Sequence, residues 1–394
     1  MRLILSVDAI FPPLTGIGRY AYELATRLPA VAGIEEVRYL GLFGWVPVPP
    51  STAQDAVAPY LLASTGYGSL RRKMAARTWA VRIYDAVSEF WRGRLLRKER
   101  SGAVFHSPNF FLPPYDGPSV ATVHDLSIYR FPDTHLAARR RYFDLAFERS
   151  LRRADTLITV SEAVRRELIA DYAVDAARVT AIHHGADAAF RPRDAQQLQP
   201  VLSRHGLQAG GYTLSVATLE PRKKLDRLIA AYARLPASLR QRHPLVLTGS
   251  AGWLNDHIRE AIDRGRAEGW LRYLGYVPQE ELPALYAGAR ALALISVYEG
   301  FGLPVLEAMA SGIPVLTSNV SSLPEVAGGA ALLVDPDDVP AVSGQLERLL
   351  TDEPWRASAV AAGLQRARQF TWERCVQRTV EVYATAQQRH GHSG

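Results

Sequence analysis

The sequence lacks most features of secreted and membrane-spanning proteins. Cys375 is the only cysteine among 394 residues, so no internal disulfide can form. The opening apolar run, Leu3–Val7, is too short for a signal-peptide core and ends at Asp8. No apolar run approaches the roughly 20 residues needed to cross a bilayer. We therefore expect a cytoplasmic protein.

The chain has enough apolar residues to fold without covalent links. Hydrophobic residues make up 48% and charged residues 22% of the sequence, which is ordinary for a globular protein. Short apolar runs alternate with helical patterns, which indicates parallel sheets with helical crossovers. We predict strands at Leu3–Val7, Val37–Leu42, Val104–His106, Val120–Val123, Leu157–Val160, Val179–Ile182, Tyr212–Ala217, Leu245–Thr248, Leu271–Leu274, Ala291–Ile295 and Val315–Thr317.

This alternation stops at a linker, Phe190–Gln199, and then begins again. We therefore predict two Rossmann-like α/β domains, residues 1–190 and 191–370, facing each other. The remaining segment, 371–394, would be a helix from about Thr371 to Gln387, capped by Thr371.

The net charge of +7 is concentrated in one segment. Arg71–Arg100 holds ten Lys or Arg against three Asp or Glu, and has helical periodicity; more arginines follow within 139–153. Such charge attracts phosphate groups, acidic lipid or nucleic acid. The alternative interpretation is a solvated helix face.

Four motifs follow predicted strands, where ligands of parallel sheets bind. Gly16-Ile17-Gly18-Arg19-Tyr20-Ala21 opens a helix, so it suits close approach of a phosphate. It also fits the dinucleotide fingerprint, but the second strand ends without the acid that would hold a ribose. A plain tight turn remains the third interpretation.

The second and third motifs are His124-Asp125 and Arg222-Lys223-Lys224. The imidazole of His124 could donate to a sugar hydroxyl, or simply be hydrogen-bonded in a loop. The three cations suit a diphosphate, or form a basic surface loop. His183-His184 follows another strand and is interpreted as a turn between domains.

The fourth motif is a glycine loop between two acids, Glu299 and Glu307. Pro304 suits the first turn of a helix, which would aim loop amides at an anion. The carboxylates could bind sugar or ribose hydroxyls through charge-assisted hydrogen bonds. Alternatively, Glu307 merely lies favourably in the helix dipole. Asp335–Asp338 is not an Asp-x-Asp motif at a strand end; we interpret it as a helix cap.

The fourth motif, Glu299-Gly300-Phe301-Gly302-Leu303-Pro304 through Glu307, resembles the signature of family 4 retaining glycosyltransferases of the GT-B fold. Thr15–Tyr20, Val123–Leu126, Val160–Glu162 and Arg222-Lys223 follow in that family's order, so the resemblance covers nearly the whole chain. In such proteins the last helix crosses back onto the first domain. This sequence departs from the family pattern at Ala217-Thr218, where many members have glycine followed by arginine.

The resemblance implies a role for each matching residue. Glu307 would bind the donor ribose, and Glu299 would lie beside the transferred sugar. Backbone amides of Gly300, Phe301, Gly302 and Leu303 would bind sugar hydroxyls and phosphate. Arg222 and Lys223 would neutralise the leaving diphosphate. Gly16 and Gly18 would let the first domain approach diphosphate and sugar, and His124 would contact the sugar near its 6-hydroxyl.

Within this family, the motif Thr-Gly-Ile-Gly-Arg-Tyr resembles that of bacterial mannosyltransferases of surface-polysaccharide assembly. The resemblance implies GDP-mannose as donor, a glycan on polyprenyl diphosphate as acceptor, and no metal or other cofactor. Arg71–Arg100, with Trp79 and Trp91, could lie on the anionic inner leaflet of the plasma membrane. No nucleic acid partner is implied. The alternatives are a transferase of UDP- or ADP-sugars, a sugar-nucleotide epimerase and a non-catalytic glycan-binding scaffold.

Overall fold

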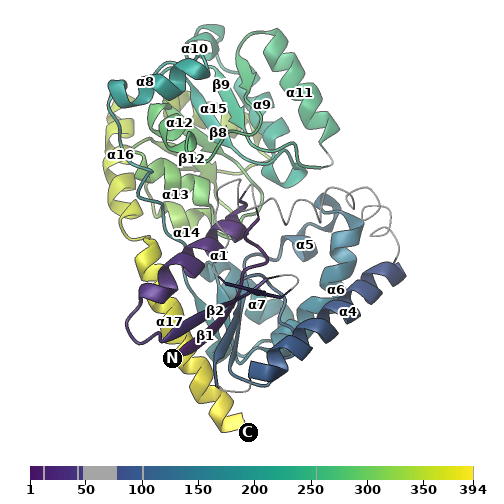
Figure 1. Ribbon diagram of the computed structural model, residues 1–394. Helices are drawn as coiled ribbons and strands as arrows, with labels where there is room; N and C mark the ends of the chain where they lie inside the picture. The colour runs from purple at the N-terminus through teal and green to yellow at the C-terminus, as the bar shows by residue number, and fades with distance from the viewer. Residues whose placement is uncertain (12–13, 42–43, 48–77, 100–101, 254, 394) are drawn as a thin grey trace. The chain divides into compact units, whose positions relative to one another are not determined.

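A computed structural model describes residues 1–11, 14–41, 44–47, 78–99, 102–253 and 255–393 (Figure 1). Its contacts divide the chain into two compact units. Unit 1 comprises Met1–His184 and Trp372–Gly394, and unit 2 comprises Gly185–Thr371. The sequence-based boundaries, after residues 190 and 370, lie close to these positions.

Unit 1 is built on a seven-stranded sheet of order β3-β2-β1-β4-β5-β6-β7. Its strands are β1 (Arg2–Ser6), β2 (Glu36–Leu40), β3 (Trp45–Val46), β4 (Val104–Ser107), β5 (Ser119–Val123), β6 (Thr156–Thr159) and β7 (Val179–Ala181). All pairings are parallel except that of β2 with β3. The central strands β4, β5 and β6 are buried along their whole length, as expected for strands covered on both faces.

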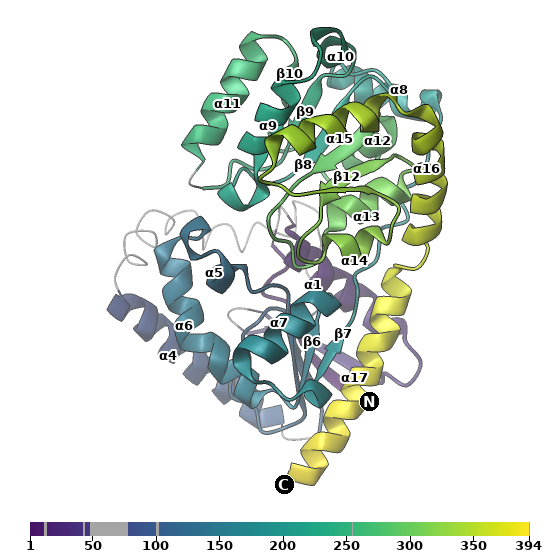
Figure 2. The same cartoon turned by 180° about the vertical axis from the view of Figure 1, so that it is seen from behind.

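Helices cover this sheet and connect its strands (Figures 1 and 2). They are α1 (Gly16–Arg27), α4 (Thr78–Leu96), α5 (Ser127–Arg130), α6 (Ala137–Arg153), α7 (Glu162–Tyr172) and α17 (Trp372–Ser393). Ser161 caps α7, because its side chain accepts a hydrogen bond from the backbone N–H of Val164.

The last helix, α17, belongs to unit 1 although it follows all of unit 2 in the chain (yellow in Figures 1 and 2). Trp372, Val376 and Tyr383 are buried in the same apolar cluster as Leu3 and Leu5 of β1. The Nδ1 atom of His106, at the end of β4, lies 2.7 Å from the hydroxyl of Tyr383. The last helix therefore packs on the first domain, as the predicted fold class requires.

Unit 2 is built on a six-stranded sheet of order β10-β9-β8-β11-β12-β13, in which every pairing is parallel. Its strands are β8 (Thr213–Val216), β9 (Leu245–Thr248), β10 (Leu271–Tyr273), β11 (Ala291–Leu294), β12 (Val315–Ser318) and β13 (Leu332–Val334). Its helices are α8 (Ala195–Arg204), α9 (Leu225–Ala233), α10 (Ala237–Arg242), α11 (Asp256–Ala267), α12 (Leu282–Gly288), α13 (Leu303–Ala310), α14 (Leu323–Ala327), α15 (Val339–Thr351) and α16 (Glu353–Ala367).

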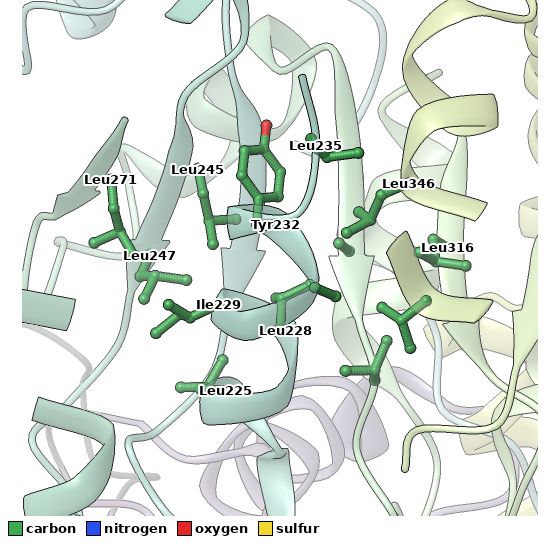
Figure 3. Packing of buried hydrophobic residues seen from close by; sticks show 14 of the residues in the cluster. Leu225, Leu228, Ile229, Tyr232, Leu235, Leu245, Leu247, Leu271, Leu316 and Leu346 are labelled. Carbon is green, nitrogen blue, oxygen red and sulfur yellow. The ribbon is translucent and has the colours of Figure 1, made fainter. Parts of the chain in front are cut away.

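The core of unit 2 lies between this sheet and its helices (Figure 3). Leu225, Leu228, Ile229 and Tyr232 recur along α9 with helical spacing and pack in one cluster with Leu245 of β9. This packing fixes the start of α9, and with it the basic turn that precedes that helix.

Two strands were not predicted. They are β3 and β13. Both are short, and β3 exists because Trp45 and Val46 pair antiparallel with Leu40 and Tyr39. Such long-range pairing leaves little trace in a local sequence pattern. Among the described residues, no helix is both long and apolar enough to cross a bilayer.

Candidate active site

Two cations and two carboxylates meet at the carboxyl ends of β8 and β11. The short turn Pro221–Lys223 follows β8, and Glu299 lies beyond β11. The Nζ atom of Lys223 lies 2.7 and 2.8 Å from the two carboxylate oxygens of Glu299. The Nη1 atom of Arg222 lies 3.5 Å from Oε2 of Glu299, and its Nη2 atom lies 2.6 Å from Oε1 of Glu220. We call Glu220, Arg222, Lys223 and Glu299 the charge cluster.

The charge cluster is largely removed from water. The side chain of Glu220 is 4% exposed, and those of Arg222, Lys223 and Glu299 are 11–13% exposed. Burial alone would raise the pKa of Glu299, but the neighbouring Lys223 and Arg222 outweigh it and hold that pKa below the usual value. Glu299 is therefore ionised at neutral pH, and the cluster carries as many negative as positive charges.

Serine side chains hold the backbone around Glu299 in place. The hydroxyl of Ser296 donates to Oε1 of Glu299 at 2.6 Å. The hydroxyl of Ser322 donates to the backbone carbonyls of Glu299 and Phe301, each at 2.8 Å. The backbone N–H of Glu299 donates to the hydroxyl of Ser321, a residue with the left-handed φ of 56°. Such strained backbone is kept where the surroundings fix it, often at functional sites.

The glycine loop leads into α13 as the sequence predicted. Gly302 precedes the helix with a φ of 110°, and Pro304 lies in its first turn. A side chain at Gly302 would be strained by that φ and would place its Cβ 2.9 Å from Leu323. The ring of Phe301 is buried against Phe370, with ring centroids 5.8 Å apart, so only its backbone can serve a ligand.

Glu307 lies one turn into α13 and is half-buried. It interacts with the phenol of Tyr286 on α12, whose pKa is raised by burial and then by the Glu307 carboxylate. A carboxylate beside a phenol that keeps its proton is well placed to bind hydroxyl groups of a ligand.

Lys224 is separated from the charge cluster although it follows Lys223 directly. Its backbone has a left-handed φ of 51°, which ends the turn and points the chain into α9. Its Nζ atom lies 2.7 Å from Oδ1 of Asp337, on the loop before α15. The structure thus divides the three basic residues: Arg222 and Lys223 contact Glu299, and Lys224 contacts Asp337.

The loop that contains Asp337 has a structural role. The side chain of Asp338 accepts a hydrogen bond from the backbone N–H of Ala341 and caps α15, which confirms the interpretation of this segment as a helix cap. Within the described ranges, no group of three or more His, Cys, Asp or Glu residues could hold a metal ion.

The predicted residues of unit 1 lie in that unit's own loops. Gly16 is exposed at the first position of α1, where the sequence motif was expected to open a helix. The backbone N–H of Gly18 donates to Oγ1 of Thr15, which caps the helix. A Cβ at Gly18 would lie 2.8 Å from the carbonyl oxygen of Ala9. Gly18 is thus needed where α1 packs closely on the Ala9 backbone, and its amide already has a partner.

His124 is buried at the end of β5. Its Nε2 atom lies 2.7 Å from the carbonyl oxygen of Pro108, which can only accept, so Nε2 carries the proton. Burial lowers the pKa of His124 to about 4, so the ring is neutral at neutral pH. The remaining nitrogen, Nδ1, is an acceptor. Contact of His124 with a sugar hydroxyl stays a prediction, with Nε2 already engaged by Pro108.

His184 is part of the core of unit 1. It is 3% exposed and lies against Trp372 and Tyr20. It is also the last residue of unit 1 before the chain enters unit 2. The interpretation of His183-His184 as a turn between domains agrees with this position.

Sequence patterns did not reveal several residues of the site. Glu220, Tyr286, Ser296, Ser321 and Ser322 were not predicted. For Glu220, an acid directly before the basic turn Pro221–Lys223 is a usable sign in the sequence. The others come from separate strands and helices, so no local pattern could have found them.

Comparison with known proteins places this geometry in a family. A family model described as glycosyl transferases group 1 matches residues 207–366, and one described as Glycosyltransferase Family 4 matches residues 14–190. The chain is 39% identical over 383 residues to O-antigen chain mannosyltransferase B of Escherichia coli, covering 97% of this chain and 99% of that one. The chain belongs to the family 4 glycosyltransferases.

Other relatives support the same family membership and fold. The serotype-specific mannosyltransferase WbdA of Escherichia coli is 33% identical over 235 residues, which is 59% of this chain and 29% of WbdA. Among solved structures, WaaG, a glycosyltransferase involved in lipopolysaccharide biosynthesis, matches with a TM-score of 0.71, 16% identity and coverage of 97% and 99%. Sucrose-phosphate synthase of Thermosynechococcus elongatus matches with a TM-score of 0.70, 20% identity and coverage of 98% of each chain.

These matches confirm the predicted GT-B fold class and show that the protein is a glycosyltransferase. The charge cluster, the glycine loop and Glu307 all lie within the residues matched by the group 1 model. Gly16, Gly18 and His124 lie within those matched by the family 4 model.

Proposed function

We propose that this glycosyltransferase moves mannose from GDP-mannose, with retention at the anomeric carbon, onto a glycan carried by polyprenyl diphosphate. The observation that supports mannose is the 39% identity, over nearly the whole of both chains, to a mannosyltransferase of O-antigen chains. The product would be a bacterial surface polysaccharide.

The charge cluster supplies the chemistry that this reaction needs. Loss of the nucleoside diphosphate builds negative charge on its phosphates, and Lys223 and Arg222 would stabilise that charge without a metal ion. Glu299 would then be released from these cations to bind hydroxyls of the sugar. Glu307 and the amides that begin α13 would bind the ribose and the phosphates. We propose a front-face reaction without a covalent intermediate; detection of a stable glycosyl-enzyme adduct would contradict it.

Two neighbouring lysines offer a matched test of this site. We would measure thermal stabilisation by GDP-mannose, UDP-sugars and ADP-sugars in the wild type, in Lys223→Ala and in Lys224→Ala. The proposal expects stabilisation by GDP-mannose that is lost in Lys223→Ala and kept in Lys224→Ala, because Lys224 contacts Asp337 instead. Stabilisation by another nucleotide sugar would contradict the mannose assignment.

A transfer assay with radiolabelled GDP-mannose separates the alternative activities. Transfer to a lipid-linked glycan supports the proposal. Conversion of the donor to an epimer without an acceptor would indicate an epimerase. Donor binding without either reaction would indicate a glycan-binding scaffold.

We further propose that unit 1 binds an anionic membrane surface through α4. Val87, Phe90 and Trp91 are 61%, 62% and 51% exposed, and their spacing places them on one face of the helix. Arg94, one turn later, and Arg97 are exposed as well. Exposed aromatic residues beside cations are typical of helices that lie in the interface of an anionic bilayer.

Residues 71–77 and 100 of the predicted basic region, and the side chain of Trp79, lie outside what the structure describes. Two arginines of the basic stretch that follows form ion pairs with α4. On α6, Arg149 forms an ion pair with Asp85 of α4, and Arg153 forms one with Glu89. These arginines therefore hold α4 against α6 and are already neutralised.

Vesicle binding tests the membrane proposal. The wild type should bind vesicles that contain anionic lipid more tightly than vesicles of zwitterionic lipid alone. Phe90→Ser with Trp91→Ser should weaken binding, and Tyr276→Ser, which alters an aromatic residue of unit 2 that is 56% exposed, should not. Equal affinity for both kinds of vesicle would contradict the proposal.

A further inference from the structure

Glu220 is a buried acid that the proposed reaction does not use. Its side chain is 4% exposed, and its Oε1 atom lies 2.6 Å from Nη2 of Arg222 and 4.0 Å from Nζ of Lys223. It thus faces the two cations that would bind the donor diphosphate. Glu299 contacts the same cations through Nη1 of Arg222 and through Nζ of Lys223.

The backbone that carries Glu220 is held firmly in place. The backbone N–H of Leu219 donates to the carbonyl of Ser250, and the side-chain amide of Asn255 donates to the carbonyl of Leu219. A Cβ at Gly252 would lie 2.1 Å from that same carbonyl oxygen, so the loop after β9 packs directly on the Glu220 segment. Glu220 therefore cannot easily move away from the cations when a ligand arrives.

The two acids differ in their place in the proposed reaction. Glu299 would exchange its cations for hydroxyl groups of the bound sugar, whereas the reaction gives Glu220 no such partner. Glu220 is nearly enclosed and fixed to Arg222. It remains a negative charge beside the diphosphate site whether or not the site is filled, and a fixed charge of that sign weakens the binding of an anion.

We infer that Glu220 is a positioning residue that orients Arg222 and weakens the hold of the charge cluster on the nucleoside diphosphate, so that this product is released. The inference rests on the proposed function of the cluster as the diphosphate site. It predicts that removing the charge of Glu220, while keeping its shape, makes the enzyme bind the diphosphate more tightly.

The decisive variant is Glu220→Gln, which keeps an oxygen that can accept from Arg222. We expect its dissociation constant for GDP, measured by isothermal titration calorimetry, to fall about tenfold, which is about 1.4 kcal/mol. The gain should shrink as salt concentration rises. Asp337→Asn is the matched control, because it removes an exposed acid that pairs with Lys224; it should leave GDP affinity unchanged. Unchanged or weaker GDP binding by folded Glu220→Gln would overturn the inference.

The same substitution made in the Arg222→Gln variant separates the effect of the Glu220 charge from its effect on the orientation of Arg222. It also covers the case in which Glu220→Gln alone does not fold. In Arg222→Gln, adding Glu220→Gln should still tighten GDP binding, because Glu220 also faces Lys223. If Glu220 only orients Arg222, the second substitution has no effect once Arg222 is gone, and the charge argument fails. Wild-type protein that binds neither GDP, UDP nor ADP would refute the proposed function itself.

Discussion

Replacing Lys223 by methionine tests whether its ammonium group keeps Glu299 ionised inside the protein. The substitution preserves most of the side-chain length and removes a charge 2.7 Å from the Glu299 carboxylate. Removing one partner of a buried ion pair costs about 3–5 kcal/mol. Because Arg222 and Ser296 still contact the carboxylate, we expect a loss of about 2–3 kcal/mol in the free energy of unfolding.

The pH dependence of this loss identifies its cause. In the wild type, the folded-state pKa of Glu299 lies below 4.5, so Glu299 stabilises the fold above that pH, and this contribution is lost as pH falls through the folded pKa. In Lys223→Met, the burial of Glu299 is opposed only by Arg222 and Ser296, so we expect its folded-state pKa to rise from the wild-type value. The variant's extra instability is then relieved as pH falls through the raised pKa. The difference between the two proteins should therefore be largest at neutral pH and shrink towards pH 4.5.

Urea unfolding at a series of pH values measures this difference. Lys224→Met is the control, since Asp337 is 57% exposed and such a pair contributes only a few tenths of a kcal/mol. A stability difference for Lys223→Met that is constant with pH, or no larger than that of Lys224→Met, would refute the reasoning.

Three further predictions concern stability and are tested by the same unfolding measurements. Gly249→Ala should cost about 3 kcal/mol, because its φ is 147° and its Cβ would lie 2.0 Å from the carbonyl oxygen of Ala217. Gly269→Ala should cost about 1 kcal/mol, because its φ is 79° but no atom lies near the new Cβ. Equal costs for the two glycine variants would show that the clash at Gly249 adds nothing. Lys224→Asn should stabilise by about 0.5–1 kcal/mol, since asparagine tolerates the left-handed φ. A loss would show that the ion pair to Asp337 matters more. The pKa of His124 falls from 6.5 to about 4 on folding, so the neutral ring stabilises the fold above pH 6.5, and on the order of 3 kcal/mol of this stability is lost by pH 4. His124→Phe should make the decline of stability with falling pH less steep. An unchanged slope would contradict a buried neutral ring.

Local patterns predicted most of the strands in both units. The strand at Leu245–Thr248 was predicted with the bounds that the structure shows, and the others differ by one or two residues. The central strands of both sheets are buried on both faces, so they appear as nearly continuous apolar runs. β13 was missed although residues 330–334 form a continuous apolar run, Ala-Ala-Leu-Leu-Val, at the edge of the sheet.

Candidate site residues were found where glycine, proline and charge gather directly after a strand. The glycine loop with Glu299 and Glu307, and the turn with Arg222 and Lys223, were recognised in this way. The structure adds a packing role for Gly18, whose missing side chain lets α1 lie close to Ala9. Its predicted approach to a phosphate stays a prediction.

The sequence by itself determined the α/β alternation, the two-domain organisation and the motifs of a family 4 glycosyltransferase, because these are recorded in short-range order. Only the tertiary structure decided which charges meet. Lys223 and Lys224 are adjacent and chemically identical, yet they bind acids 76 and 113 residues away. The left-handed backbone of Lys224 turns it out of the cluster, and the packing of the loop after β9 holds Glu220 within it. Ion pairing depends on distances that only the folded chain defines.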